Sequence, residues 1–564
     1  MGLTAALSAA GTALDVFSAG IQVAGNNIAN ANDPNYIRQA LNLNPALPVQ
    51  QGTLIFGSGV TAQGVKQQVD RYLLQRIYAS NAESSGAGMT NSIYQQLEST
   101  LQTLTGSDLS SQLTGLANAF NNLVNQPELT ANRQLAVQQG VQFARAVAIL
   151  RSQIDTLRTS VNQNVDGLVR EANGLIDQIN DLNPRITRLE SAGLLQSDAG
   201  ALRDLRYAAI NRLTKIIPVT VVDHGPLGIE VSINGQALII PGQVQHLTTT
   251  SRNDRGVAVS DVSVQNSNLV IGGTKGELAG AVLGRDTVIG GFTDQLDQFA
   301  AAVINQVNVI HSSGQGIHGY DSVTGTYQVK TPTSALDAAS LPFTPQNGSF
   351  QVHVVNTSTG LEQTGTISVD LAGVNPKTTL SDIVTQLNAL TNVTASVTGD
   401  NRLQITAANG YELKFSDDDS GALAALGINT FFTGWTSSNI GVNSALTADP
   451  TLLAAAKGGG AGDGNNASIL ANLPSLSPSS LGGATIGNFF QQAVAGLGQA
   501  SASQNAVTEG AQGFSDSLNN QRSQYSGVSL DTETIQVMQF QQSYQGAARF
   551  ISVIDQLFTI LTQL

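Results

Sequence analysis

Residues 3–31 read LTAALSAAGTALDVFSAGIQVAGNNIANA, and residues 537–561 read VMQFQQSYQGAARFISVIDQLFTIL. Both stretches repeat apolar side chains every seven residues, in two interleaved rows. This spacing predicts a helix at each end of the chain, with a narrow apolar seam that packs against another helix. The seam residues are Leu3, Leu7, Leu14, Phe17, Ile21 and Ile28 at one end, and Val537, Phe540, Tyr544, Ile551, Ile554, Phe558 and Leu561 at the other.

The residues that flank the seam are mostly Ala, Gly, Gln, Ser, Thr and Asn. An ordinary dimerising coiled coil uses charged flanking residues to choose its partner. Two weakly charged, narrow-seamed ends indicate a chain that assembles through its termini. The alternative is a single antiparallel helix pair that closes one domain.

The composition limits the class of protein. A chain of 564 residues is long enough for several domains, each with its own core, yet only 12% of its residues are charged. The net charge of -14 argues against nucleic-acid binding, because no basic surface is available for phosphates. The absence of cysteine excludes disulfides, thiol catalysis and thiolate metal sites, and suits a protein exposed to oxidants.

The sequence shows no targeting segment. Its first basic residue is Arg38, so the positive region of a secretory signal peptide is missing. It has no uninterrupted run of eighteen apolar residues, and we therefore expect no membrane insertion. Either the protein stays in the cytosol or it leaves by a route that cleaves nothing.

The interior predicts a multidomain α+β protein. Apolar residues recur every seven positions from Val147 to Leu189, which predicts a long helix that Pro184 should kink or end near Asn183. Shorter helices are predicted at 93–104, 109–124 and 293–310. We therefore expect a terminal coiled-coil domain at 1–45 and 525–564, and an elongated helical-bundle domain at 46–331 and 431–524.

Strand patterns occur in two regions. Near 218–274, alternating apolar residues flank Asn234-Gly235, a strong hairpin turn, and predict β-hairpins within the helical domain. From 332 to 430, five alternating stretches surround one helical stretch at 380–390. We expect this segment to be a β-rich outer insertion domain.

Residue patterns that support catalysis or cofactor binding are weak. His311 and His318 follow a predicted helix in a Gly- and Ser-rich turn, where polar loop residues are commoner than metal ligands. Asp417-Asp418-Asp419 lacks the spacing of a calcium loop, and the glycines of 458–464 lack the Lys-Ser/Thr of a phosphate loop. We therefore assign no catalytic, cofactor-binding or metal-binding residue and expect no enzyme.

Two further motifs carry a resemblance. The first ends the N-terminal helix with Asn26, Asn27, Ile28, Ala29, Asn30, Pro34 and Tyr36, and the second begins the C-terminal helix with Gly527 and Leu530. Asn and Asp favour caps and turns, and Pro34 disfavours helix at the residue before it. Together the motifs resemble the signatures of bacterial flagellar axial proteins, the rod, hook and hook-associated family. Asp33, Asn35 and Ile37 depart from that pattern.

The interior resembles the hook-associated branch of this family over roughly 1–320 and 430–564. Asn122–Ile154, Asp204-Leu205-Arg206, Gly276–Gly280 and Asp294–Ala300 carry the likeness. Hook and rod proteins share the terminal signatures but should lack the long helical block.

The resemblance implies a structural subunit at the junction between hook and filament. Such a subunit is exported unfolded through the flagellar type III pathway, without a cleaved signal peptide, and is extracellular. The implied partners are further copies of itself in a ring-like polymer, the hook protein, the second junction protein, and a cytosolic export chaperone on the C-terminal helix. The alternatives are another flagellar axial subunit (hook or distal rod) or a secreted adhesin-like binding protein.

Overall fold

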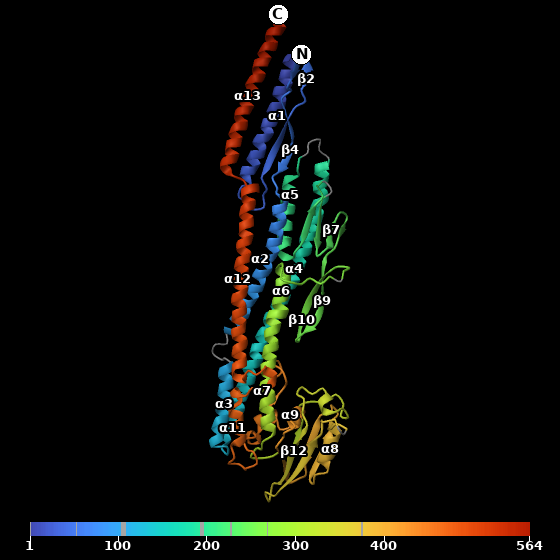
Figure 1. Cartoon of the computed structure of the whole chain (residues 1–564), viewed down its shortest axis with the longest axis vertical. Coiled ribbons are helices and arrows are strands. Elements are labelled where there is room, and N and C mark those ends of the chain that lie inside the picture. The colour runs from blue at the N-terminus through green and yellow to red at the C-terminus, as the bar shows by residue number, and fades with distance from the viewer. Residues whose placement is uncertain are drawn as a thin grey trace. The chain divides into compact units, whose positions relative to one another are not determined.

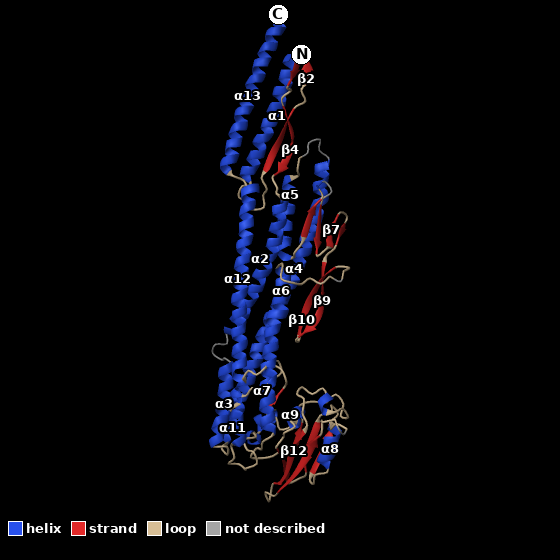
Figure 2. Cartoon of the chain, in the orientation of Figure 1, coloured by secondary structure: helices blue, strands red, loops and turns tan. Residues whose placement is uncertain are grey.

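A computed structural model describes residues 2–51, 54–102, 109–191, 197–225, 228–267, 269–373 and 376–563. It confirms the multidomain α+β class: long helices alternate with small antiparallel sheets (Figures 1 and 2). The chain divides into two compact units. Unit 1 comprises 1–93, 159–286 and 501–564, and unit 2 comprises 94–158 and 287–500. The boundaries of the three predicted domains stay a prediction.

Unit 1 holds both chain termini. Its helices include α1 (Gly2–Ala29), α5 (Gly200–Ile216), α6 (Glu277–Leu283) and α13 (Leu530–Gln563). It also takes in parts of α2 (Arg71–Gln102), α4 (Thr130–Ser191) and α12 (Ile486–Ser526). Two small sheets lie near α1, and they pair β1 (Gln39–Pro45) with β4 (Val60–Gln67) and β2 (Val49–Gln51) with β3 (Leu54–Phe56).

The hairpins predicted near 218–274 are present. One sheet has the order β5-β6-β7-β8, formed by Thr220–Asp223, Ile229–Ile233, Gln236–Ile240 and Gln243–Val244. A second hairpin pairs β9 (Leu247–Asp254) with β10 (Val257–Val264). Asn234 and Gly235 have φ of 47° and 82°, the left-handed pair that a two-residue hairpin turn requires. The local turn signal therefore predicted the β6–β7 hairpin correctly.

Unit 2 combines helices with the strands of the predicted insertion. Its helices are α3 (Leu109–Asn125), α7 (Gly290–Ser312), α8 (Leu380–Asn388), α9 (Ala422–Leu426), α10 (Ser444–Ala448) and α11 (Asn465–Ala471), with the remaining parts of α2, α4 and α12. Phe120, Phe143, Phe299, Phe431 and Phe432 contact one another edge-on or tilted and fill its helical core.

Within the described part of unit 2, the strands form two three-stranded antiparallel sheets and one short pair. One sheet has the order β13-β12-β16 (Glu362–Val369, Gly348–Asn356, Tyr411–Ser416), and the other has the order β11-β15-β14 (Ser322–Thr324, Leu403–Ala407, Val393–Val397). β17 (Phe432–Thr433) pairs with β18 (Gly441–Val442). β11 lies before residue 332, where the insertion was predicted to begin, but it pairs with β15 from within that segment. A pairing between residues so far apart in sequence leaves no local pattern.

One sequence-based expectation about the helices is wrong, and a second is answered only in part. The helix predicted at 93–104 is only the end of α2, which begins at Arg71. Pro184 does not end α4, which continues to Ser191. Proline removes one backbone hydrogen bond from the helix. The side chain of the preceding residue, Asn183, forms hydrogen bonds with two neighbouring segments of unit 1. Its Nδ2 donates to the Ile229 carbonyl at 3.2 Å and its Oδ1 accepts from Arg206 at 2.9 Å.

One helix meets the length and hydropathy criteria for a membrane span, although the sequence lacks a long uninterrupted apolar run. By length and composition alone, α1 could cross a membrane, because an 18-residue window reaches a mean hydropathy of 1.3. Small residues such as Ala and Gly raise this average without forming an uninterrupted apolar run. The same test is passed by core helices and by signal sequences, so it is weak evidence.

Candidate functional site at the paired terminal helices

The helices α1 and α13 lie side by side and antiparallel, with both chain ends at the same end of the pair (Figure 1). Phe17 and Phe540 meet across the pair with ring centroids 6.5 Å apart. A Cβ atom at Gly20 would lie only 2.8 Å from the Phe540 ring. Gly20 therefore allows the two helices to approach closely at this level.

The seam residues differ in how much of each side chain the pair covers. Ile554 is buried, at 2% exposed, and most of the others are partly buried. The partly buried set is Leu3, Leu14, Phe17, Ile21 and Ile28 on α1, and Val537, Phe540, Ile551 and Phe558 on α13. Leu7, Tyr544 and Leu561 are 39%, 40% and 62% exposed, so the single chain does not bring them into the seam. Val16, which lies outside both heptad rows, is 4% exposed instead.

A buried polar cluster closes the inner end of this helix pair. Asn27 is 1% exposed, and its Nδ2 donates to the Gln39 carbonyl at 2.9 Å and to Glu533 Oε2 at 3.0 Å. Its Oδ1 accepts from the Tyr36 hydroxyl at 2.8 Å and from the Gln39 backbone N–H at 3.0 Å. One amide therefore joins the end of α1, the loop after it and the start of α13. We call Asn27, Tyr36, Arg38, Gln39 and Glu533 the Asn27 clamp.

The charged pair in the clamp was not predicted from the sequence. Glu533 lies in the first turn of α13, where an acidic side chain complements the helix dipole. In the structure its side chain is fully buried, and Arg38 Nε donates to Glu533 Oε1 at 2.6 Å. Arg38 NH1 also donates to Gln68 Oε1 at 3.0 Å. The chain has few charged residues, and Arg38 and Glu533 lie close to the two terminal motifs. This was the one feature of the sequence that could have suggested the pair.

Asp204 connects the loop after α1 to α5. Its Oδ1 accepts from Gln67 Nε2 at 2.7 Å and from the Ile37 backbone N–H at 3.3 Å. Burial raises the pKa of Asp204 to about 6, although these two hydrogen bonds oppose the shift. Burial also raises the pKa of the Tyr36 hydroxyl to about 12, with help from the nearby Asp204 and Glu533 carboxylates. The tyrosine is therefore a neutral hydrogen-bond donor to Asn27 at physiological pH.

The remaining motif residues form turns on either side of the clamp. α1 ends at Ala29, and Asn30 Nδ2 then donates to the Asn26 carbonyl at 3.0 Å. The Pro34 carbonyl accepts a hydrogen bond from Arg522 of α12. Gly527 lies between the end of α12 and the start of α13, and Leu530, the first residue of α13, is 52% exposed. The Ser529 hydroxyl accepts from the Thr532 backbone N–H at 3.4 Å, as an N-cap does.

Within the described residues, no group of three or more His, Asp, Glu or Cys side chains could hold a metal ion. The chemistry of this site is therefore that of helix packing: an apolar seam, one close glycine contact and a buried polar clamp. Such a site can bind another helix.

Comparison with known proteins agrees with this description. Residues 94–325 match the model for the flagellar hook-associated protein FlgK helical domain, and residues 520–564 match the flagellar basal body rod FlgEFG protein C-terminal model. Flagellar hook-associated protein 1 of Escherichia coli K12 is 25% identical, over 97% of this chain and 97% of its own length. The chain belongs to the flagellar hook-associated protein 1 family. Members of this family are axial components of the bacterial flagellum.

Two further relatives match over shorter lengths. Flagellar hook-associated protein 1 of Bacillus subtilis strain 168 is 24% identical over 49% of this chain and 59% of its own length. The Salmonella typhimurium LT2 protein is 26% identical over 54% and 56%. The solved structure of the flagellar hook junction protein FlgK from Burkholderia pseudomallei covers 79% of this chain and 99% of its own, with 16% identity and a TM-score of 0.49.

Proposed function

We propose that this chain is a structural subunit that forms the junction between the flagellar hook and the filament, and that it assembles there through α1 and α13. The observation that carries the proposal is a second apolar face on α13. Phe550, Val553, Leu557 and Ile560 follow one another at helical spacing and are 46% to 56% exposed. They alternate with the inner-face residues Ile551, Ile554 and Phe558, so α1 covers only one side of α13.

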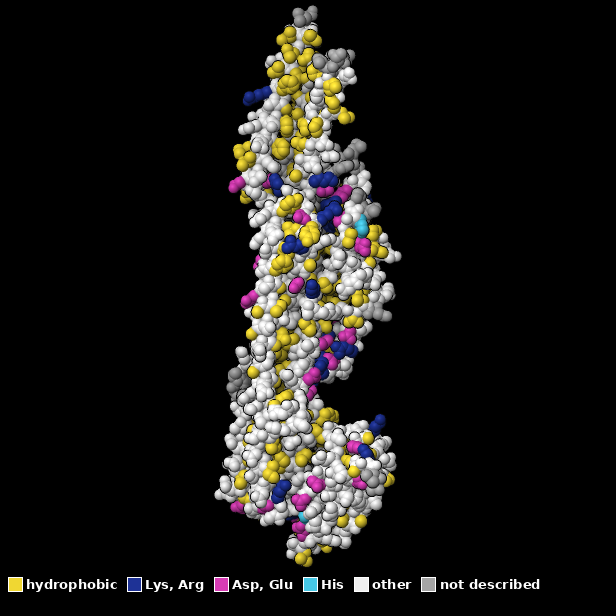
Figure 3. Space-filling view, in the orientation of Figure 1, with side chains coloured by type: hydrophobic (Ala, Val, Ile, Leu, Met, Phe, Trp, Pro, Cys, Tyr) yellow, Lys and Arg dark blue, Asp and Glu magenta, His cyan; other side chains and the backbone are white. Residues whose placement is uncertain are grey.

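Figure 3 shows hydrophobic side chains gathered over α13 and the neighbouring α1. A contiguous apolar face of this kind marks a site of protein association. Burying each large side chain contributes about 1.5–3 kcal/mol. Neighbouring subunits that cover the second face would therefore stabilise the helix pair on assembly.

The same face supports the proposed partners and export route. We infer that the hook protein, further copies of this chain and the second junction protein supply the covering surfaces in the flagellum. A cytosolic export chaperone would cover α13 before the chain leaves the cell unfolded, without cleavage. The match of 94–325 to the FlgK helical domain favours this assignment over a hook or distal rod subunit.

We also propose that the chain is not an enzyme. One arrangement in unit 2 has the residue types of a hydrolase triad: Ser416 Oγ lies 2.7 Å from His353 Nε2, and His353 Nδ1 contacts Glu362. However, Ser416 is only 3% exposed and its hydroxyl also donates to Asp417 Oδ2 at 3.3 Å. A side chain so enclosed and already bonded does not present a nucleophile to a substrate.

A charge on the second face of α13 tests the proposal. Val553→Asp places a carboxylate where we expect a neighbouring subunit to exclude water, and an unpaired buried charge is costly. In a strain whose own copy is deleted, we expect this variant to be secreted but to leave hooks without filaments and filament subunits in the medium. Electron microscopy and motility assays provide the readout.

Ser552→Asp is the matched control, because Ser552 is an exposed polar neighbour in the same turn. It should support filament growth, and both variants should melt like the wild type because both positions are exposed in the free chain. Normal filaments on Val553→Asp hooks would show that the second face is not an assembly surface. Filaments in the deletion strain itself would refute the junction role.

The energetics of the helix pair lead to a second expected result. Ordering a residue's backbone costs about 1–2 kcal/mol, which offsets much of the burial gained by one half-covered helix pair and leaves it less stable than the rest of the chain. In a verified monomer, we therefore expect limited proteolysis to remove 1–45 and 530–564 first, while the remainder resists. Mass spectrometry of the fragments gives the cut sites. Protection of both termini in the monomer would contradict ordering on assembly.

A further inference from the structure

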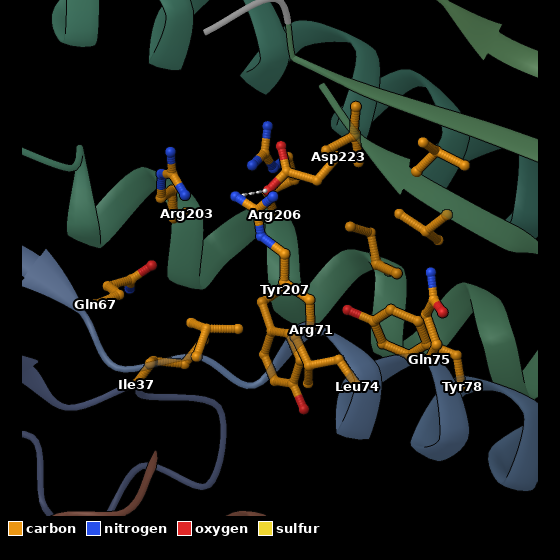
Figure 4. Close-up of a pocket in the computed structure, with 15 residues that line it drawn as sticks. Ile37, Gln67, Arg71, Leu74, Gln75, Tyr78, Arg203, Arg206, Tyr207 and Asp223 are labelled. Atoms are coloured by element: carbon orange, nitrogen blue, oxygen red, sulfur yellow. Dashed lines mark ion pairs between the residues drawn. The ribbon is translucent and has the colours of Figure 1, made fainter. Parts of the chain in front are cut away.

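Unit 1 contains a cavity of about 250 Å³ among the start of α2, the middle of α5 and the strands β5 and β6 (Figure 4). It lies outside the α1–α13 seam, and the proposed junction function does not use it. An apolar cavity of about 150 Å³ is large enough to hold benzene. This cavity therefore has room for a small organic molecule.

Three arginines line the cavity, and two of them are paired with carboxylates. Arg203 donates to both oxygens of Glu190, at 2.6 and 2.8 Å. Arg71 NH2 lies 3.2 Å from Asp223 Oδ2, and Figure 4 shows this ion pair. These two cations are thus compensated by residues of the chain itself.

Arg206 is different. It is only 6% exposed, and within the described residues its single hydrogen bond is from NH1 to Asn183 Oδ1, at 2.9 Å. No carboxylate lies within ion-pair distance of it among those residues. A buried guanidinium carries five N–H donors, and a buried charge without a directly paired opposite charge is costly. Burial and the nearby Arg203 lower the pKa of Arg206, while the Asp223 and Glu190 carboxylates, beyond ion-pair distance, partly oppose this shift.

A second donor lacks a partner in the same cavity. Tyr78 is 7% exposed, and its hydroxyl makes no hydrogen bond to any described residue. Apolar side chains, among them Leu74, Ile210 and Ile229, form much of the remaining wall. The cavity therefore combines a guanidinium that pairs directly with no carboxylate of the described residues, a hydroxyl with no partner among them, and an apolar wall.

We propose that this cavity binds a small organic acid, a carboxylate on a short apolar or aromatic stem, with the carboxylate on Arg206 and Tyr78 and the stem against the apolar wall. A planar carboxylate accepts the forked N–H groups of a guanidinium with two parallel bonds. Phosphate or sulfate would leave the apolar wall uncovered, and a neutral apolar molecule would leave Arg206 uncompensated. The stem and the single negative charge thus define the ligand class together.

Calorimetric titration of the full chain with benzoate and with benzamide tests the proposal. The two probes have similar shape, but only benzoate is charged. We expect benzoate to bind the wild type in the millimolar range or more tightly, and benzamide to bind at least tenfold more weakly. Arg206→Gln should weaken benzoate binding at least tenfold. Arg185→Gln, which removes an exposed arginine outside the cavity, should leave binding unchanged.

Tyr78→Phe provides a variant with little risk to folding, because the hydroxyl it removes has no partner in the described chain. It should weaken benzoate binding several-fold and leave the melting temperature unchanged. Equal binding of benzoate and benzamide, or equal binding by wild type and Arg206→Gln, would overturn the proposal. A third result would also overturn the proposal: benzoate does not bind, and Arg206→Gln weakens self-association while Arg185→Gln does not. The carboxylate that pairs with Arg206 would then belong to a neighbouring copy of the chain.

Discussion

Arg38→Met should destabilise the terminal helix pair by about 3–5 kcal/mol, the usual cost of removing one partner from a buried ion pair. Among the described residues, the substitution leaves the fully buried Glu533 carboxylate with the Asn27 amide as its one side-chain partner. Hydrogen exchange measured by mass spectrometry over 27–40 and 530–545 should show strongly accelerated exchange. Trp435, the only tryptophan, lies in unit 2 and reports that unit separately, so its fluorescence transition in urea should not move.

The opposite member of the pair provides the control. Glu533→Gln keeps an oxygen for Asn27 and leaves the charge on Arg38, which is 19% exposed and can reach water. We therefore expect a smaller acceleration of exchange than in Arg38→Met. The double variant Arg38→Met with Glu533→Leu should recover most of the lost protection, since an apolar pair often replaces a buried ion pair at little cost. Equal effects of Arg38→Met and Glu533→Gln would show that the charge on Glu533 is not the source of the cost.

Features with a short sequence period were predictable, and features that join distant residues were not. The heptads of α1 and α13 and the Asn234-Gly235 turn are local signals, and the corresponding helices and hairpin are present. The pairing of Arg38 with Glu533 joins residues 495 positions apart, and no local spacing marks it. The same limitation explains why β11, which pairs with β15, fell outside the predicted insertion.

The heptad spacing also does not show which seam residues are buried within a single chain. Tyr544 and Leu561 satisfy the spacing as well as Ile554 does, but only Ile554 is buried. Close approach at Gly20 and the cluster around Asn27 fix the rotation of α13, and both depend on contacts across the pair. The apolar rows exposed on α13 require a partner that the sequence of one chain does not describe.

His311 shows the same limitation within unit 2, where the sequence suggested a polar loop residue. It lies instead in the last turn of α7 and is fully buried. Its Nδ1 lies 2.8 Å from the Asn429 carbonyl, to which it donates, and its Nε2 accepts from the Ala454 backbone N–H at 3.0 Å. The ring therefore joins three segments in its neutral form only, because a proton on Nε2 would remove the second bond.

Unit 2 should consequently lose stability in acid. Burial lowers the pKa of His311 from 6.5 to about 4, and the nearby Arg133 adds to the shift. Between these values the unfolded chain binds a proton that the folded chain does not, so stability falls as the pH falls from 6.5 and the loss is complete below 4. The shift corresponds to about 3 kcal/mol. Urea unfolding followed by Trp435 fluorescence at several pH values measures it.

A matched pair of variants isolates the contribution of this histidine. His311→Asn cannot titrate, so whatever its stability at pH 7.5, its unfolding free energy should vary less between pH 6.5 and 4 than that of the wild type. His318→Asn makes the same change at a histidine of unit 2 whose side chain is 65% exposed, and it should keep the wild-type slope. If His311→Asn retains the full slope, other groups cause the acid sensitivity, and the neutral ring of His311 does not control it.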